Sequence, residues 1–310
     1  MPRSCVGVFV DVPSVSRNGG YGMRYDVLRA FACRDSSEPV RLNAYVAFDQ
    51  DRATTDAAYR ATQENYYALL RDFGYKIVKK VNRVITDEAG NRCTRANTDF
   101  EMAVDVLIQA ERFTRVVLVT GDGEFARVSQ ALQSCGCRVE VIGFENVSST
   151  LRREADAFYS GYTIPSLLPA LVERADAAPW GEPGSRVRGV CYNHHEKGYG
   201  LFRFLRRISA DLWKIDSRQD DSPFATAFFH DSNLPPDINA ADLPNRHYIF
   251  EFELVVDETR NRGLVARNIL LASPRRRPLV RPLTDSDPTV LTYEPPAVPV
   301  ASAAALAETK

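Results

Sequence analysis

The sequence lacks long hydrophobic runs, an excess of charge of either sign, and a repeated cysteine motif. No stretch of about 18 or more apolar residues occurs, so a membrane span is not expected. The 39 Lys and Arg residues nearly balance the 40 Asp and Glu residues, and a formal net charge of -1 provides no overall basic field for nucleic acid. Any binding of nucleic acid would therefore depend on local patches.

The use of cysteine also limits the class of protein. Six cysteines are scattered along the chain, and the first apolar run, Val6–Val10, is too short for a signal peptide. We therefore expect reduced thiols and a cytoplasmic protein. Cys135 and Cys137 have no second cysteine pair and no nearby histidine, so a zinc site is not expected there.

The composition provides enough apolar material for two cores. Hydrophobic residues make up 45% of the 310 positions, and a length of about 150 residues per domain predicts two domains. We expect an α/β domain over 1–172, a flexible linker over 173–185, and a small all-β barrel over 186–272. The Arg-, Pro- and Ala-rich tail, 273–310, is predicted to be disordered.

The first domain alternates strand and helix signals. Strands are predicted at Val6–Val10, Arg41–Phe48, Tyr75–Val81, Val116–Val119 and Arg138–Ile142, with a polar loop over Asn91–Asn97. Helices are predicted over 23–32, from about 54 to Gly74, over 98–109, and from the loop after Thr120 to Ser134. This alternation predicts a mainly parallel sheet with helices on both faces.

Several carboxylates follow the predicted strands. Asp11 ends the first strand, and Asp122 and Glu124 follow the strand at Val116–Val119. The carboxyl ends of parallel strands collect functional groups, and carboxylates that meet there repel one another. A divalent cation relieves this repulsion, and oxygen ligands favour Mg²⁺ or Mn²⁺, which can activate water against a phosphodiester.

Two further acids lie on the predicted helix at 98–109. Asp99 is at its start, and Asp105 lies about 120° around the helix, so both serve one site only if Asp99 lies at its entrance. A structural role is the alternative for each acid; for example, Asp99 would be stabilised at the helix start by the helix dipole. Thr98 and Glu101 are predicted to form a capping box at the same helix start. The five acids Asp11, Asp99, Asp105, Asp122 and Glu124 are the candidate catalytic residues.

Three segments of the first domain resemble a known family. Val8–Asp11, Asn97–Asp105 and Val117–Phe125 match, in order and spacing, the three motifs of the NYN domain of PIN-like nucleases. The resemblance covers about residues 5–160. It implies metal-dependent cleavage of RNA, with Mg²⁺ or Mn²⁺ held by Asp11, Asp99, Asp122 and Glu124.

The chain departs from the family pattern near these acids. Ser14 stands where the family usually has Asn, Ala96 where many members have Lys, and Glu124 replaces Asp. We expect Ser14, Arg95 and Thr120 to contact the substrate, because their side chains can hydrogen-bond a phosphate.

The second domain resembles cold-shock domains, which are OB-fold barrels. Asn193–Phe202 and Ala227–His230 resemble their two nucleic-acid motifs, although Cys191 and Leu201 replace aromatic residues. Strand alternation places Tyr199 and Phe228, with His230, on an outer face that would stack single-stranded bases, and Phe202, Phe204 and Phe229 inside. Lys197 and Arg203 are expected to contact phosphates.

The sequence therefore predicts a metal-dependent endoribonuclease whose OB-fold domain captures single-stranded RNA, with no membrane partner and with homo-oligomers left open. A non-catalytic RNA-binding regulator, using a degenerate nuclease fold as a scaffold, is the alternative. A phosphatase with Asp11 as nucleophile fits less well, because Asp11 is followed by Val12 and Pro13 instead of a second acid two residues on.

Overall fold

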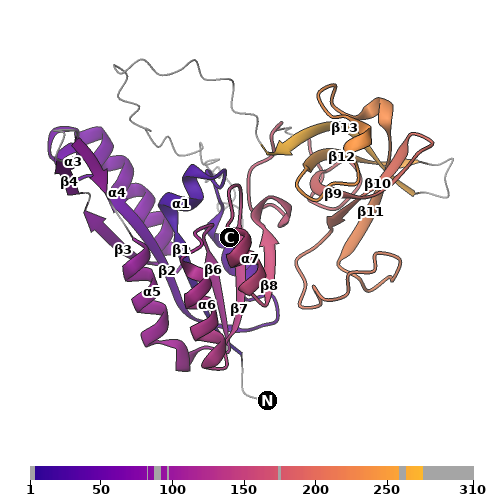
Figure 1. The fold of residues 1–310 in the computed structure, drawn as a ribbon. Coiled ribbons are helices and arrows are strands. Elements are labelled where there is room, and N and C mark those ends of the chain that lie inside the picture. The colour runs from indigo at the N-terminus through magenta and orange to yellow at the C-terminus, as the bar shows by residue number, and fades with distance from the viewer. Residues whose placement is uncertain are drawn as a thin grey trace, which may run out of the picture.

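The computed structural model describes residues 4–81, 83–86, 92–95, 98–173, 176–257 and 263–274, with the backbone alone for 83–86 and 92–95. An α/β domain and a barrel lie side by side (Figure 1). The predicted fold class, a mainly parallel α/β sheet followed by an all-β barrel, is confirmed. In the part of the chain that is described, no helix is both long and apolar enough to cross a membrane.

The α/β domain is built on a six-stranded sheet in which every pair is parallel. Its order is β3 (Lys76–Val81), β2 (Glu38–Phe48), β1 (Cys5–Asp11), β6 (Arg115–Val119), β7 (Arg138–Gly143) and β8 (Ala157–Ser160). The chain moves outward in one direction from β1 to β3 and in the other from β6 to β8. The carboxyl ends of β1 and β6 therefore meet at the point where the strand order reverses, which is where open α/β sheets bind ligands.

Helices connect these strands. They are α1 (Val12–Arg17), α2 (Tyr25–Ala32), α3 (Gln50–Thr55), α4 (Ala57–Asp72), α5 (Asp99–Ile108), α6 (Phe125–Ser134) and α7 (Ser149–Glu154), with 3-10 turns η1 (Ala110–Arg112) and η2 (Gly161–Thr163). The short helix α1 was not predicted. Two features of the sequence favour a helix start here. Pro13 lies in the first turn, and Asp11 is the N-cap residue, whose side chain accepts a hydrogen bond from the backbone N–H of Ser14.

Alternation along the central strands divides the core between the two faces of the sheet. Val6, Val8 and Val10 of β1 pack in one cluster with residues of α2 and α4, whereas Phe9 packs in a second cluster with residues of α5 and α6. All five residues of β6 are buried, as the β-branched run predicts for a strand covered on both sides. The helices thus cover both faces, as expected.

A small antiparallel pair lies outside the main sheet. β4 (Arg83–Thr86) pairs with β5 (Arg92–Arg95), with Arg83 opposite Arg95. The prediction of a polar loop over Asn91–Asn97 is therefore wrong for 92–95, because local composition carries no information on a pairing partner several residues upstream. Ala96 and Asn97 lie outside the described residues.

The barrel is closed by five strands in the order β10 (Tyr199–Leu205), β11 (Phe224–His230), β13 (Gly263–Ser273), β12 (Ile249–Asp257) and β9 (Arg186–His195). β11 and β13 pair in parallel and the other pairs are antiparallel, which gives an OB-like mixed barrel. Short 3-10 turns η3 (Asp231–Asn233) and η4 (Ala240–Asp242) follow β11. Phe202, Phe204 and Phe229 fill the interior, as predicted.

The connection between the two domains is packed against the barrel. Within the expected linker, 173–185, the indole N–H of Trp180 donates to the carbonyl of Leu205 at 2.8 Å, and the N–H of Gly184 donates to the carbonyl of Leu254 at 2.7 Å. This part of the connection therefore contacts the barrel, through Trp180 and Gly184, instead of forming a free tether. Residues 174–175 and the tail beyond 274, with Arg275–Arg277, lie outside the described residues.

One outer strand of the sheet is strongly basic. β3 forms an edge among the described strands and carries Lys76, Lys79 and Lys80. The Nζ atom of Lys79 lies over the rings of Phe48 and Tyr67, and Lys80 forms an ion pair with Glu101 of α5. Lys76 and Lys79 remain largely exposed.

Candidate functional site

Asp11 lies at the centre of the carboxyl ends of β1 and β6, with only 3% of its surface exposed. Its Oδ1 accepts hydrogen bonds from the N–H of Ser14 at 3.2 Å and from the hydroxyl of Thr98 at 3.3 Å, and its Oδ2 accepts one from the hydroxyl of Thr120 at 3.4 Å. Burial raises the pKa of Asp11, and these donors oppose the rise only in part. The carboxyl group is held in one orientation at the strand end.

The start of α5 brings a second acid to Asp11. Thr98 is buried, and its hydroxyl binds Asp11 instead of the helix N-terminus. The capping box predicted for Thr98 and Glu101 is therefore wrong, because each side chain finds a distant charged partner, Asp11 for Thr98 and Lys80 for Glu101. The hydrogen bond of Thr98 holds the N-terminus of α5 beside β1 and places Asp99 near Asp11. We call the four acids Asp11, Asp99, Asp122 and Glu124 the acidic edge.

The pKa of Asp99 indicates that the acids lie close to one another. Its pKa is raised to about 6, first by burial and then by the negative charges of Asp11, Asp122 and Glu124, and its carboxyl group is hydrogen-bonded to that of Asp11. Two carboxyl groups in direct contact share a proton, because placing two negative charges there costs free energy. The four acids expected at this site therefore interact with one another.

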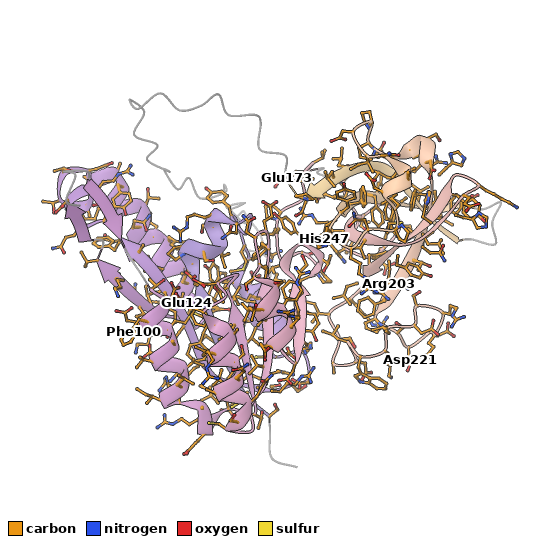
Figure 2. All side chains as sticks on the ribbon, viewed as in Figure 1. Phe100, Glu124, Glu173, Arg203, Asp221 and His247 are labelled. Carbon is orange, nitrogen blue, oxygen red and sulfur yellow. The ribbon has the colours of Figure 1, made fainter. Side chains whose placement is uncertain are left out.

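The loop after β6 positions the other two acids. The backbone N–H of Asp122 donates to the hydroxyl of Thr120, and the N–H of Glu124 donates to Oδ1 of Asp122 at 2.9 Å. Asp122 is half-buried, and Glu124, labelled in Figure 2, is exposed just before α6. Gly123 permits this tight turn, since a Cβ atom there would lie 2.8 Å from Oγ of Ser148 in the loop after β7.

Other predicted site residues are placed differently. Asp105 accepts a hydrogen bond from the hydroxyl of Tyr45 at 2.8 Å and lines separate hollows with Lys76, so the structure does not bring it to the other acids. Ser14 is buried in the first turn of α1. The backbone of Arg95 ends β5, and its side chain lies outside the described part of the chain.

The acidic edge fits a divalent cation by the chemistry of its donors. All four side chains offer carboxylate oxygens. The charges of Asp11, Asp122 and Glu124 raise the pKa of Asp99, whereas the positive charge of Arg17 lowers the pKa of Asp11. Among the described side chains, no three His, Cys, Asp or Glu groups form a ready-made metal site. Asp122 and Glu124 are not buried, so their side chains have room to reorient.

The barrel carries an outer row of stacked rings. The ring of Tyr199 stacks on Phe228 with centroids 5.6 Å apart, and on His195 with centroids 5.0 Å apart. Tyr199 and Phe228 are half-exposed and His195 is exposed. We call Tyr199, Phe228 and His195 the stacked row. The sequence predicts Tyr199, Phe228 and His230 on one outer face, and in the structure His195 also stacks on Tyr199.

Basic residues border the stacked row. The guanidinium of Arg203 (Figure 2) lies over the rings of Tyr192 and Phe224, at 5.6 Å from each centroid, and burial lowers its pKa. Lys197 is exposed in the turn between β9 and β10. His230 is opposite Tyr199 in the β10–β11 register, but its Nδ1 atom lies 2.9 Å from the hydroxyl of Ser232 and accepts a hydrogen bond from the N–H of that residue.

Sequence reasoning missed Thr98 and His195 as members of these sites. Thr98 contacts Asp11 across 87 positions, and the only local signal was a polar residue before a helix. His195 follows an adjacent histidine, and only the pairing of β9 with β10 places it opposite Tyr199. In both cases the partner is supplied by the tertiary fold.

Comparison with known proteins places the α/β domain in a family. The family model of the NYN domain matches residues 5–167. The low amplitude and bright protein LabA of Synechococcus elongatus is 26% identical over 172 residues, which is 53% of this chain and 88% of LabA. A crystal structure of a protein of unknown function from Vibrio parahaemolyticus is 23% identical, with a TM-score of 0.41, over 51% of this chain and 93% of that one.

Proposed function

The chain belongs to the NYN-domain family, and from this premise we propose that it is a metal-dependent endoribonuclease whose barrel binds single-stranded RNA. The observation that supports catalysis is the group of four interacting acids at the ends of β1 and β6 and at the start of α5. Mg²⁺ or Mn²⁺ would be held by Asp11, Asp99, Asp122 and Glu124. When bound there, the cation would supply activated water and stabilise charge on the phosphodiester.

The residues around the acids have separate roles in this proposal. Thr98 and Thr120 hold the carboxylate of Asp11 in one orientation through their hydroxyl groups. In the metal-free protein the pKa of Asp99 is raised to about 6, so binding of the cation would release a proton from this group. Ser14 and Arg95 are proposed to contact the phosphate. The stacked row, with Arg203 and Lys197 at its border, would hold unpaired bases and phosphates.

Cleavage assays test the acidic site. Wild-type protein should cleave single-stranded RNA with Mn²⁺ or Mg²⁺ and not with EDTA, and Asp11→Asn and Asp122→Asn should each lower the rate by about 100-fold or more. Asp216→Asn is the matched control, because Asp216 forms an exposed ion pair with Arg218 in the barrel domain. Equal residual cleavage by wild type and both site variants would exclude this site.

A non-catalytic RNA-binding regulator is the second candidate. It is favoured by the absence of a ready-made three-ligand site among the described side chains and by Ser14 in place of Asn. RNA binding that persists without any metal-dependent turnover would support it. A phosphatase is disfavoured, since Asp11 is followed by Val12 and Pro13 instead of a second acid two residues on.

A further inference from the structure

We infer that the barrel is fixed on the α/β domain and makes the protein cleave RNA at a constant number of nucleotides from the segment that the barrel binds. This inference rests on the proposed function and adds product spacing to it. It follows from how the two domains are joined, because a flexible tether would allow the bound RNA to reach the acidic site in many registers.

A shared hydrophobic cluster joins the two domains. Tyr162, Ile164 and Leu167 at the end of the α/β domain are buried in one cluster with four barrel-domain residues: Leu205, Leu212, Ile249 and Ala272. These four do not belong to the barrel's own core, which is a separate cluster centred on Phe202 and Phe250. The shared cluster therefore connects apolar side chains of the two domains.

A buried ion network crosses the same junction. Glu251 of β12 is 1% exposed and binds the side chains of Arg186 and Arg188, at 2.8 Å each. Both of its oxygens also accept from the backbone N–H of Leu171 at 3.0 Å, and Arg188 donates to the carbonyl of Pro169. Directional hydrogen bonds to main-chain atoms of 169–171 fix an orientation that apolar contact alone does not.

The junction continues to the acidic edge. The hydroxyl of Ser273, the last residue of β13, lies 3.4 Å from Oε1 of Glu145 in the loop after β7. That loop contacts the elements around the acids, since the N–H of Glu145 donates to the carbonyl of Asn18 and the N–H of Ser148 donates to the carbonyl of Gly121. The barrel is thus attached to the loop that supports the Asp122 turn.

A fixed junction gives a fixed RNA register. Tyr199 and Phe228 lie on strands of the same closed barrel that carries Glu251, so a base stacked on them keeps one position relative to the acids. The phosphate that reaches Asp11 is then determined by the length of RNA between the two sites. Loosening the junction would leave both sites intact and spread the cleaved positions.

Photo-crosslinking of the RNA to the barrel tests this inference. Single-stranded RNA carrying one 4-thiouridine is crosslinked to the full chain, Mn²⁺ is added, and the cleaved phosphates are mapped relative to the crosslinked nucleotide. Wild type should cleave at one phosphate or its immediate neighbours, and the cut should move with the 4-thiouridine when its position is changed.

Leu212→Ser should spread the cuts over many phosphates while leaving the rate on free RNA unchanged, because Leu212 lies in the shared cluster. Ile215→Ser, at a 59% exposed position of the same loop, is the matched control and should keep the wild-type pattern. Backbone relaxation by NMR should give one tumbling time for both wild-type domains and two for Leu212→Ser.

The outcomes separate the two proposals. Scattered cuts by crosslinked wild type, or two tumbling times for its domains, would overturn the fixed spacing while leaving the nuclease function standing. Absence of cleavage on both free and crosslinked RNA would overturn the proposed function and, with it, the spacing.

Discussion

At the scale of single residues, the acidic edge combines a fixed carboxyl group with a titrating one. Asp11 is buried and receives three hydrogen bonds, whereas Asp99 is half-buried and titrates near pH 6. The two groups are in contact, so the ionisation of each raises the free energy of ionising the other. Pairs of carboxyl groups with raised pKa values are typical of functional sites, where the charge serves ligand binding and lowers the stability of the folded state.

The raised pKa of Asp99 predicts a pH-dependent cost to stability in metal-free buffer. The folded state binds more protons than the unfolded state between the ordinary pKa of 3.8 and about 6, so the free energy of unfolding falls as pH rises through this window. The free energy of unfolding of Asp99→Asn should therefore be about 1 kcal/mol higher than that of wild type at pH 7.5, after allowing for solvent screening of this half-exposed group.

Urea denaturation in EDTA at pH 4 and pH 7.5 measures this difference. The advantage of Asp99→Asn should nearly vanish at pH 4, where Asp99 is protonated in the folded protein. An equal difference at both pH values would show that charge repulsion is not its cause.

Divalent cations should stabilise the folded chain. A cation that binds only the folded state raises the free energy of unfolding by about 2.7 kcal/mol at 100 times its dissociation constant. Thermal melts with Mn²⁺ against EDTA should show this rise for wild type and lose most of it in Asp122→Asn. Asp105→Asn should behave as wild type, because Asp105 binds Tyr45 outside the cluster; loss of the rise in both variants would contradict the ligand assignment.

At the scale of elements, the strand-end acids were predictable and their supports were not. Chain order and period-2 burial place Asp11 and Asp122 at the ends of adjacent parallel strands, because right-handed crossovers leave few alternatives. The hydroxyl of Thr98 was assigned to its own helix, since sequence patterns describe neighbours within a few residues and its partner lies 87 positions away. The same limit hid the β4–β5 pairing.

The stacked row predicts how the barrel binds RNA. Each base stacked on an aromatic side chain contributes about 1–3 kcal/mol, so Tyr199→Ala and Phe228→Ala should each weaken binding of single-stranded RNA about tenfold. Fluorescence anisotropy with labelled RNA in EDTA measures binding without cleavage. Val256→Ala, which shortens another partly exposed barrel residue, is the control, and equal affinities for all variants would rule the row out.

At the scale of the whole molecule, the junction between the domains was the feature that sequence described least well. The Pro- and Gly-rich stretch of 173–185 is typical of a linker, but Trp180 and Gly184 bind the barrel. Leu212 lies in a long, polar loop, and nothing in its neighbourhood distinguishes it from a surface leucine. An interface forms from positions that are individually unremarkable, so local patterns do not reveal it.

Glu251→Gln should strongly destabilise the full chain. The substitution leaves Arg186 and Arg188 buried without their carboxylate, and breaking a buried pair in this way costs about 3 kcal/mol or more. Chemical denaturation followed by tryptophan fluorescence measures the loss. Asp216→Asn removes an exposed ion pair and should change stability little; similar effects of the two substitutions would mean that the Glu251 network does not hold the domains together.

The lysines on β3 affect how copies of this chain meet in concentrated solution. An outer strand exposes unpaired N–H and C=O groups that can template the addition of a foreign strand, and Lys76 and Lys79 put positive charge along that border. Approach of an identical border brings like charges together and desolvates them. Neutralising these lysines would lower this barrier.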